Sequence, residues 1–141
     1  EIFLPKRWKK IENSSSKSVA INVDSTRNFN LLFEYFDIKI NQDNENRDQV
    51  ATNFINEITR DVSVEGQSLE KAGEDNYLFS FYTIENNRDE KIKNHIWYRI
   101  CVKESYIKIV SFIFTYKIEF NNIGTLYYNK INDLIKSAEL N

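Results

Sequence analysis

The sequence offers few side chains for nucleophilic catalysis, because it has one histidine, His95, and one cysteine, Cys101. His95 and Cys101 lie six residues apart on one predicted strand, so they point to the same face. At about 3.3 Å per residue they are roughly 20 Å apart, too far for a nucleophile and its base. A serine nucleophile with His95 as base stays open, although we interpret Ser14–Ser16 as a loop. We predict no catalytic residue.

Metal sites need more ligands than this chain brings together in sequence. Zinc is held by several cysteine or histidine side chains, and the sequence has one of each. The segment Asn41-x-Asp43-x-Glu45 has the ligand rhythm of a calcium loop, but Asn46 replaces the glycine at position six and Thr52 the glutamate at position twelve. We interpret it as an acidic loop before a helix, and we predict neither a metal nor a cofactor.

Paired carboxylates for acid–base catalysis would interrupt an apolar strand on one face. Glu34 and Asp37 interrupt the second long strand, but alternation places them on opposite faces. Glu34 stands among aromatic residues and is the carboxylate to check for a shifted pKa. Exposure at the strand is the simpler interpretation.

The charge balance argues against nucleic acid as a partner. Nineteen Lys and Arg face 21 Asp and Glu, a net charge of −2, although Lys6, Arg7, Lys9 and Lys10 form a basic cluster. Three glycines leave little backbone for a phosphate loop, and one cysteine excludes a disulfide within the chain. No apolar run approaches the roughly 20 residues of a membrane span.

One face of the predicted strand 92–102 has the composition of a protein contact. His95, Trp97 and Arg99 alternate on it, and Trp and Arg are enriched among residues that dominate binding energy. We predict these three as partner-binding residues. The alternative is that a helix covers this face and that Arg99 packs its stem while its end reaches out.

The elements that must position these residues follow from hydrophobic period. Apolar residues recur every third or fourth position over 47–61 and 123–138, which predicts two amphipathic helices, the first capped by Asn46 or Asp48. Alternation over short segments joined by polar turns predicts an antiparallel sheet of about six strands. The expected strands are 18–23, 30–40, a weaker 68–72, 77–84, 92–102 and 106–116, after an extended start at Ile2–Pro5.

The order of elements resembles a known group. Leu4-Pro5 and Trp8 precede two strands, a helix, a meander ending in Ser111-Phe112 and Thr115-Tyr116, and a terminal helix. This resembles the PsbP-like α/β/α sandwich group, which includes the photosystem II extrinsic subunit P, a Ran-binding nuclear-transport factor and small bacterial proteins of unknown function. The resemblance implies an α+β fold over residues 1–141 as a single domain, and binding of other proteins in place of catalysis.

We therefore expect a non-enzymatic protein-binding domain with an unidentified protein partner. An immunity or toxin-neutralising protein is one concrete form. The alternative is a small-ligand-binding protein or enzyme that uses a pocket between sheet and helix, with Glu34, His95 or tyrosines as polar groups. A cytoplasmic location is expected, and a leader cleaved before Glu1 stays open.

Overall fold

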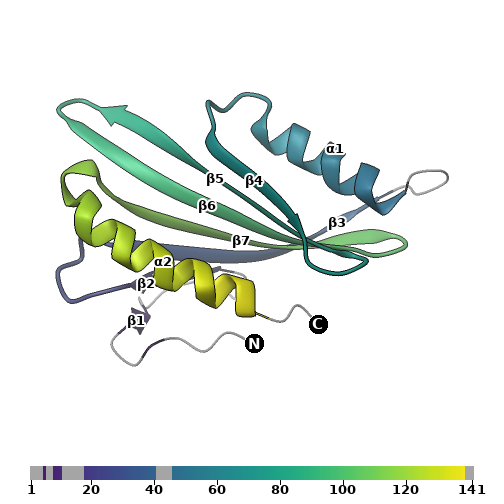
Figure 1. The fold of residues 1–141 in the computed structure, drawn as a ribbon, viewed down its shortest axis with the longest axis horizontal. Helices are drawn as coiled ribbons and strands as arrows, with labels where there is room; N and C mark the ends of the chain where they lie inside the picture. The colour runs from purple at the N-terminus through teal and green to yellow at the C-terminus, as the bar shows by residue number, and fades with distance from the viewer. Residues whose placement is uncertain (1–4, 6–7, 11–17, 41–45, 139–141) are drawn as a thin grey trace.

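The computed structural model describes residues 5, 8–10, 18–40 and 46–138, and it confirms the α+β class. Within these described residues, seven antiparallel strands form one sheet in the order β1-β2-β3-β7-β6-β5-β4, and two α-helices pack on it (Figure 1). The expected extended start at 2–4, Ser14–Ser16 and the loop 41–45 lie outside the described residues. The elements are β1 (Lys9–Lys10), β2 (Ser18–Asn22), β3 (Asn30–Lys39), α1 (Arg47–Thr59), β4 (Glu65–Lys71), β5 (Asn76–Asn87), β6 (Glu90–Val102), β7 (Tyr106–Lys117), the 3₁₀ turn η1 (Ile118–Phe120) and α2 (Asn121–Ser137).

Two strands are longer than the alternation of the sequence predicted. β5 continues to Asn87 and β6 begins at Glu90, whereas a charged turn was expected from Glu85 onward. The side chains at this end are exposed, so they carry no hydrophobic signal, but the backbone keeps pairing up to Asn87 opposite Glu90. Arg88 adopts a left-handed φ of 55° and closes the hairpin.

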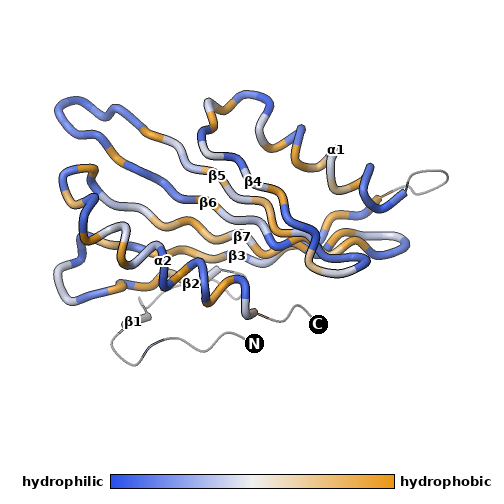
Figure 2. The backbone as a smooth tube through the Cα atoms, in the orientation of Figure 1, coloured by the Kyte–Doolittle hydropathy of each residue, from blue (hydrophilic) through white to orange (hydrophobic). Residues whose placement is uncertain are grey.

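Strand alternation divides the core into two clusters, one on each face of the sheet. The cluster on one face includes Trp97, Phe114 and Tyr116, and α2 covers it with Ile131 and Ile135. The opposite cluster lies under α1, which contributes Val50, Ala51 and Ile55. Figure 1 shows the helices on opposite sides of the sheet, and Figure 2 shows hydrophobic residues along the strands and hydrophilic ones at the β5–β6 turn. The fold is therefore an α/β/α arrangement.

The first helix begins as the sequence predicted. Asn46 is its N-cap, because the side-chain oxygen Oδ1 accepts a hydrogen bond of 2.7 Å from the backbone N–H of Gln49. The bond to Asn46 satisfies one of the N–H groups that a helix start leaves unpaired. The helix ends at Thr59, two residues earlier than expected.

The second helix buries only part of the expected stripe, which included Ile123, Leu126, Ile131 and Ile135. Ile131 and Ile135 are buried as expected. Ile123 and Leu126 are 49% and 64% exposed, whereas Gly124 is buried against the sheet. A Cβ on Gly124 would lie 2.5 and 2.8 Å from two ring carbons of Tyr116. The helix therefore approaches the sheet through its glycine, and this close approach turns Leu126 outward. A single glycine inside a helical pattern does not reveal such a contact.

Candidate functional site

The three residues predicted to bind a partner lie inside the domain, under α2. His95 is 8% exposed, Trp97 0% and Arg99 7%. The alternation put them on one face correctly, but that face is covered by a helix. The folded domain therefore does not present these side chains to a partner. Their burial corrects the prediction that they form a contact surface.

Two of these residues hold α2 in place by hydrogen bonds. Trp97 donates its indole N–H to Oδ1 of Asn132 over 3.0 Å. The Arg99 guanidinium donates to the backbone carbonyl of Ile135 over 2.8 Å, in the last turn of the helix. Carbonyls at a helix C-terminus carry partial negative charge and favour a nearby cation. Burial lowers the pKa of Arg99, and its function here is to anchor the helix.

His95 belongs to a buried polar chain that ends at the start of α2. The Tyr116 hydroxyl donates to Oδ1 of Asn121 over 3.1 Å, and Nε2 of His95 lies 3.0 Å from the same hydroxyl. Because that hydroxyl has one hydrogen, Nε2–H of His95 is assigned as the donor to its oxygen. Burial, followed by the charge of Lys93, lowers the pKa of His95 to about 4. The imidazole is therefore neutral at pH 7. Its ring centroid lies 4.4 Å from that of Tyr128, with the two rings tilted by 39°.

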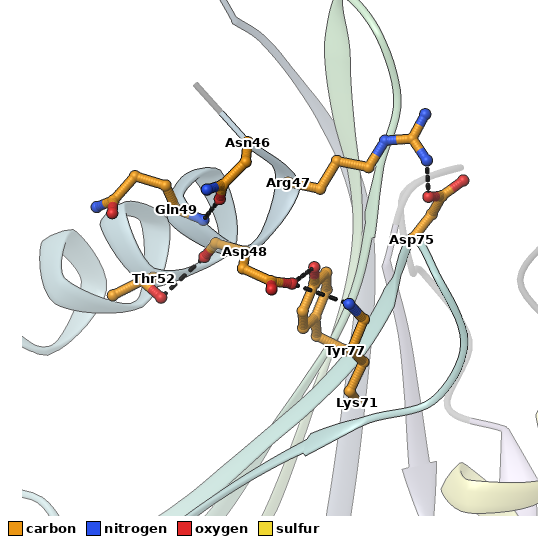
Figure 3. Close-up of polar contacts among 8 residues, drawn as sticks. All are labelled: Asn46, Arg47, Asp48, Gln49, Thr52, Lys71, Asp75 and Tyr77. Atoms are coloured by element: carbon orange, nitrogen blue, oxygen red, sulfur yellow. Dashed lines mark hydrogen bonds and ion pairs between the residues drawn. The ribbon is translucent and has the colours of Figure 1, made fainter. Parts of the chain in front are cut away.

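A second polar cluster ties α1 to the strands beneath it (Figure 3). The Asp48 carboxylate, in the first turn of α1, accepts hydrogen bonds from the Tyr77 hydroxyl and, at 3.1 Å, from Nζ of Lys71. Arg47 pairs with Asp75 just before β5. Burial, with the bond to Asp48 second, raises the pKa of Tyr77 to about 12. These contacts position the helix. The only feature of the sequence that pointed to them is an acidic residue in the first turn of a predicted helix.

The carboxylates considered for acid–base chemistry stand apart, as alternation predicted. Glu34 is exposed on the α1 side of β3, and Asp37, on the other side, accepts a 2.7 Å hydrogen bond from the Tyr35 hydroxyl. Among the residues that the structure describes, no three His, Cys, Asp or Glu side chains group as metal ligands. A hollow of about 540 Å³ lies at the β5–β6 turn and is lined by charged residues such as Glu90 and Lys117, which pair at 2.9 Å. Neither Glu34 nor His95 lines it.

Part of the sheet's α1 side carries an aliphatic row that is only half-buried. Leu32, Ile113 and Ile96 lie side by side on β3, β7 and β6 and are opposite one another in the strand register. All three side chains are half-buried. Figure 1 shows α1 over one end of the strands, while the hairpin end of β5 and β6 reaches beyond it. We call these three residues the aliphatic row.

A row of amides and hydroxyls runs beside the aliphatic row, one step nearer the β5–β6 turn. Asn30, Thr115, Asn94 and Thr83 occupy successive strands in register. The Thr115 hydroxyl donates to Oδ1 of Asn94 over 2.8 Å, and Nδ2 of Asn94 donates to the Thr83 hydroxyl over 3.3 Å. These two rows are therefore neutral, apolar along one line and polar along the next. Within the polar row, Asn94 and Thr83 are each only 9% exposed.

Comparison with known proteins adds information on the fold. No family model matches the chain, and no curated protein matches it. The chain shares its fold with LpqN. LpqN, a Mycobacterium tuberculosis protein involved in cell envelope biogenesis, superposes with a TM-score of 0.65 over 98% of this chain and 80% of that chain, at 10% sequence identity.

The likeness to LpqN covers the arrangement of elements and nothing at residue level, because 10% identity transfers no site. A second structure, from Bacteroides thetaiotaomicron, matches at 18% identity and a TM-score of 0.47, over 79% of this chain and 37% of that chain. In the part of the chain that the structure describes, no helix is long and apolar enough to cross a membrane.

The aliphatic row was missed in the sequence because every member reads as an ordinary core position. Leu32, Ile96 and Ile113 each alternate correctly within a strand. Their meeting depends on β3 pairing with β7, two elements about 80 residues apart, and on α1 being too short to cover the whole face. Neither fact follows from local pattern.

Proposed function

We propose that this chain is a non-enzymatic protein-binding domain whose docking surface is the aliphatic row. The observation that carries the proposal is the side-by-side, half-buried placement of Leu32, Ile113 and Ile96, next to the cluster that α1 covers. When a partner covers apolar surface that is in contact with water, the binding free energy becomes more favourable by about 25 cal/mol per Å². Contiguous surfaces of this kind are typical of protein contacts.

The partner segment is expected to be apolar and uncharged. The neighbouring amide and hydroxyl row is neutral. On the other side of the aliphatic row, Ser111 and Tyr98 are also neutral, and Glu34, in register with Ser111, is charged. A charged partner group placed against the aliphatic row or against the amide and hydroxyl row would lose water without gaining an opposite charge. Ile96 also packs against the cluster under α1, so the surface continues an existing helix–sheet interface.

The test combines capture with substitution. The tagged chain is used to isolate partners from a lysate of its native organism, and the affinity of the purified partner is then measured by titration. Ile113→Ser is expected to weaken that affinity at least tenfold, because it removes half-buried apolar area at the centre of the row. Leu126→Ser, on the outer side of α2, is the matched control and is expected to leave the affinity unchanged.

Two outcomes would contradict the proposal. One is a partner whose affinity survives both Ile113→Ser and Leu32→Ser in variants that remain folded by circular dichroism. The other is the failure to retain any protein specifically. Loss of affinity with Leu126→Ser alone would move the surface to α2 and would also count against the aliphatic row.

Finer versions of this function belong to the same proposal. A toxin is one concrete partner, for which co-purification with a neighbouring gene product and loss of its toxicity would be the readout. The PsbP-like assignment is supported by the α/β/α order of elements, and a cytoplasmic location is part of the proposal that cell fractionation tests. The rival function, a ligand or catalytic pocket built on Glu34 or His95, has less support because neither residue lines the hollow at the β5–β6 turn.

A further inference from the structure

An apolar crevice lies on the opposite side of the sheet from the aliphatic row, between α2 and β3. Its deep walls are the buried side chains of Leu31, Phe112, Ile131 and Ile135. Phe33 and Leu134 form its rim and are half-buried. The free space that remains is about 10 Å³, the size of one water, and apolar walls give a water no hydrogen-bond partner.

An aromatic side chain from the N-terminal part of the chain forms one wall of the crevice. Trp8 is half-buried, lines the crevice and packs against the core cluster under α2. Its backbone N–H donates to the carbonyl of Pro5 over 3.0 Å, which forms a turn. The strand that follows Trp8, β1, has two residues, Lys9 and Lys10, paired with β2. Within the residues that the structure describes around it, so short a strand gives Trp8 few backbone bonds to lose when it leaves.

We infer that this crevice is a binding site for a small neutral aromatic molecule and that Trp8 is its built-in competitor. An indole ring already packs against the apolar wall formed by α2 and β3, which fixes the size and the chemistry of the ligand. When Trp8 moves out, the space of one indole ring opens onto six apolar side chains. Among the side chains that the structure describes, none that lines the crevice is charged, so the ligand is uncharged. This inference is independent of the proposed protein-binding surface, which lies on the other face.

Competition sets the measurable consequence. A side chain tethered beside its own site acts at an effective concentration of the order of millimolar, so it reduces the apparent affinity of a free ligand. The apparent dissociation constant equals the intrinsic constant divided by the fraction of molecules with Trp8 displaced. Removing the Trp8 ring should therefore raise the affinity for a free aromatic molecule by at least tenfold.

Free indole is the probe, titrated into the whole chain and followed by NMR. Trp8→Ala is expected to bind indole at least ten times more tightly than the wild type. In the wild type, near-saturating indole is expected to move the side-chain N–H signal of Trp8 toward its position in an unstructured peptide, while that of Trp97 stays. Adding Leu134→Trp to Trp8→Ala fills the rim and is expected to abolish binding, whereas adding Leu126→Ala, outside the crevice, leaves it intact.

Equal affinities for indole in the wild type and Trp8→Ala, or binding that survives Leu134→Trp, would overturn the inference. Should Trp8→Ala fail to fold, the wild-type titration decides. A Trp8 signal that stays in place up to the solubility limit of indole would then overturn it, and displacement of that signal would support it.

Discussion

Gly124 offers a test in which two physical effects have opposite signs. Gly124 lies inside α2, and alanine is more favourable than glycine in a helix interior by about 1 kcal/mol. On propensity alone, Gly124→Ala should stabilise the protein. A Cβ at this position, however, would lie 2.5 and 2.8 Å from ring carbons of Tyr116, far inside normal contact distance.

The packing effect should be the larger one. Tyr116 is 2% exposed, and its hydroxyl is hydrogen-bonded to Asn121 and lies 3.0 Å from His95, so its ring has little freedom to move away. Overfilling a packed core costs about 1–3 kcal/mol. Subtracting the propensity gain of about 1 kcal/mol leaves an expected net loss of up to about 2 kcal/mol in the free energy of unfolding.

The assay is urea unfolding of the wild type, Gly124→Ala and a matched control. Asn129→Ala, at an exposed position of the same helix, is expected to be neutral or slightly stabilising. In the background of Tyr116→Ala the cost of Gly124→Ala should disappear, because the ring that it meets is gone. A Gly124→Ala protein more stable than the wild type would refute the close helix–sheet contact.

Three further predictions concern the buried polar groups. Arg99→Met is expected to lower the free energy of unfolding by about 1–2 kcal/mol, since the Ile135 carbonyl loses a charged donor, and hydrogen exchange should show faster opening of the last turn of α2. The folded-state pKa of His95, about 4, lies below its usual value of 6.5, so the contribution of neutral His95 to the free energy of unfolding is complete above pH 6.5 and is lost as pH falls toward 4, by roughly 3 kcal/mol. Urea unfolding at pH 7 and 4.5 should show a smaller loss of stability in His95→Phe than in the wild type, and an equal loss would contradict this. Tyr77→Phe is expected to lower stability by about 1 kcal/mol through loss of its bond to Asp48, measured by the same unfolding assay, and an unchanged value would contradict that role.

The sequence predicted the elements better than it predicted what covers them. Local periodicity found α1 with its Asn46 cap and the β5–β6–β7 meander, because these depend on neighbours in the chain. It also placed His95 and Arg99 on one face correctly. Whether a helix lies over that face is decided by tertiary packing, which alternation does not encode. That is why a predicted contact surface is found buried under α2.

The remaining differences have the same origin. The expected stripe of α2 included Leu126, which is exposed because the helix approaches the sheet at Gly124. The weak strand expected at 68–72 is β4, which starts at Glu65 and contains an irregularity near Gly66, where φ is 61°. Its side chains are exposed throughout, so backbone pairing with β5 defines it and hydrophobicity does not.

The most direct test of the proposed docking surface is methyl NMR during titration with the captured partner. The methyl signals of Leu32, Ile96 and Ile113 are expected to shift or broaden in proportion to the bound fraction, and those of Ile123 and Leu126 on α2 are expected to stay in place. Shifts confined to Ile123 and Leu126, with the aliphatic row unmoved at saturation, would contradict the proposal.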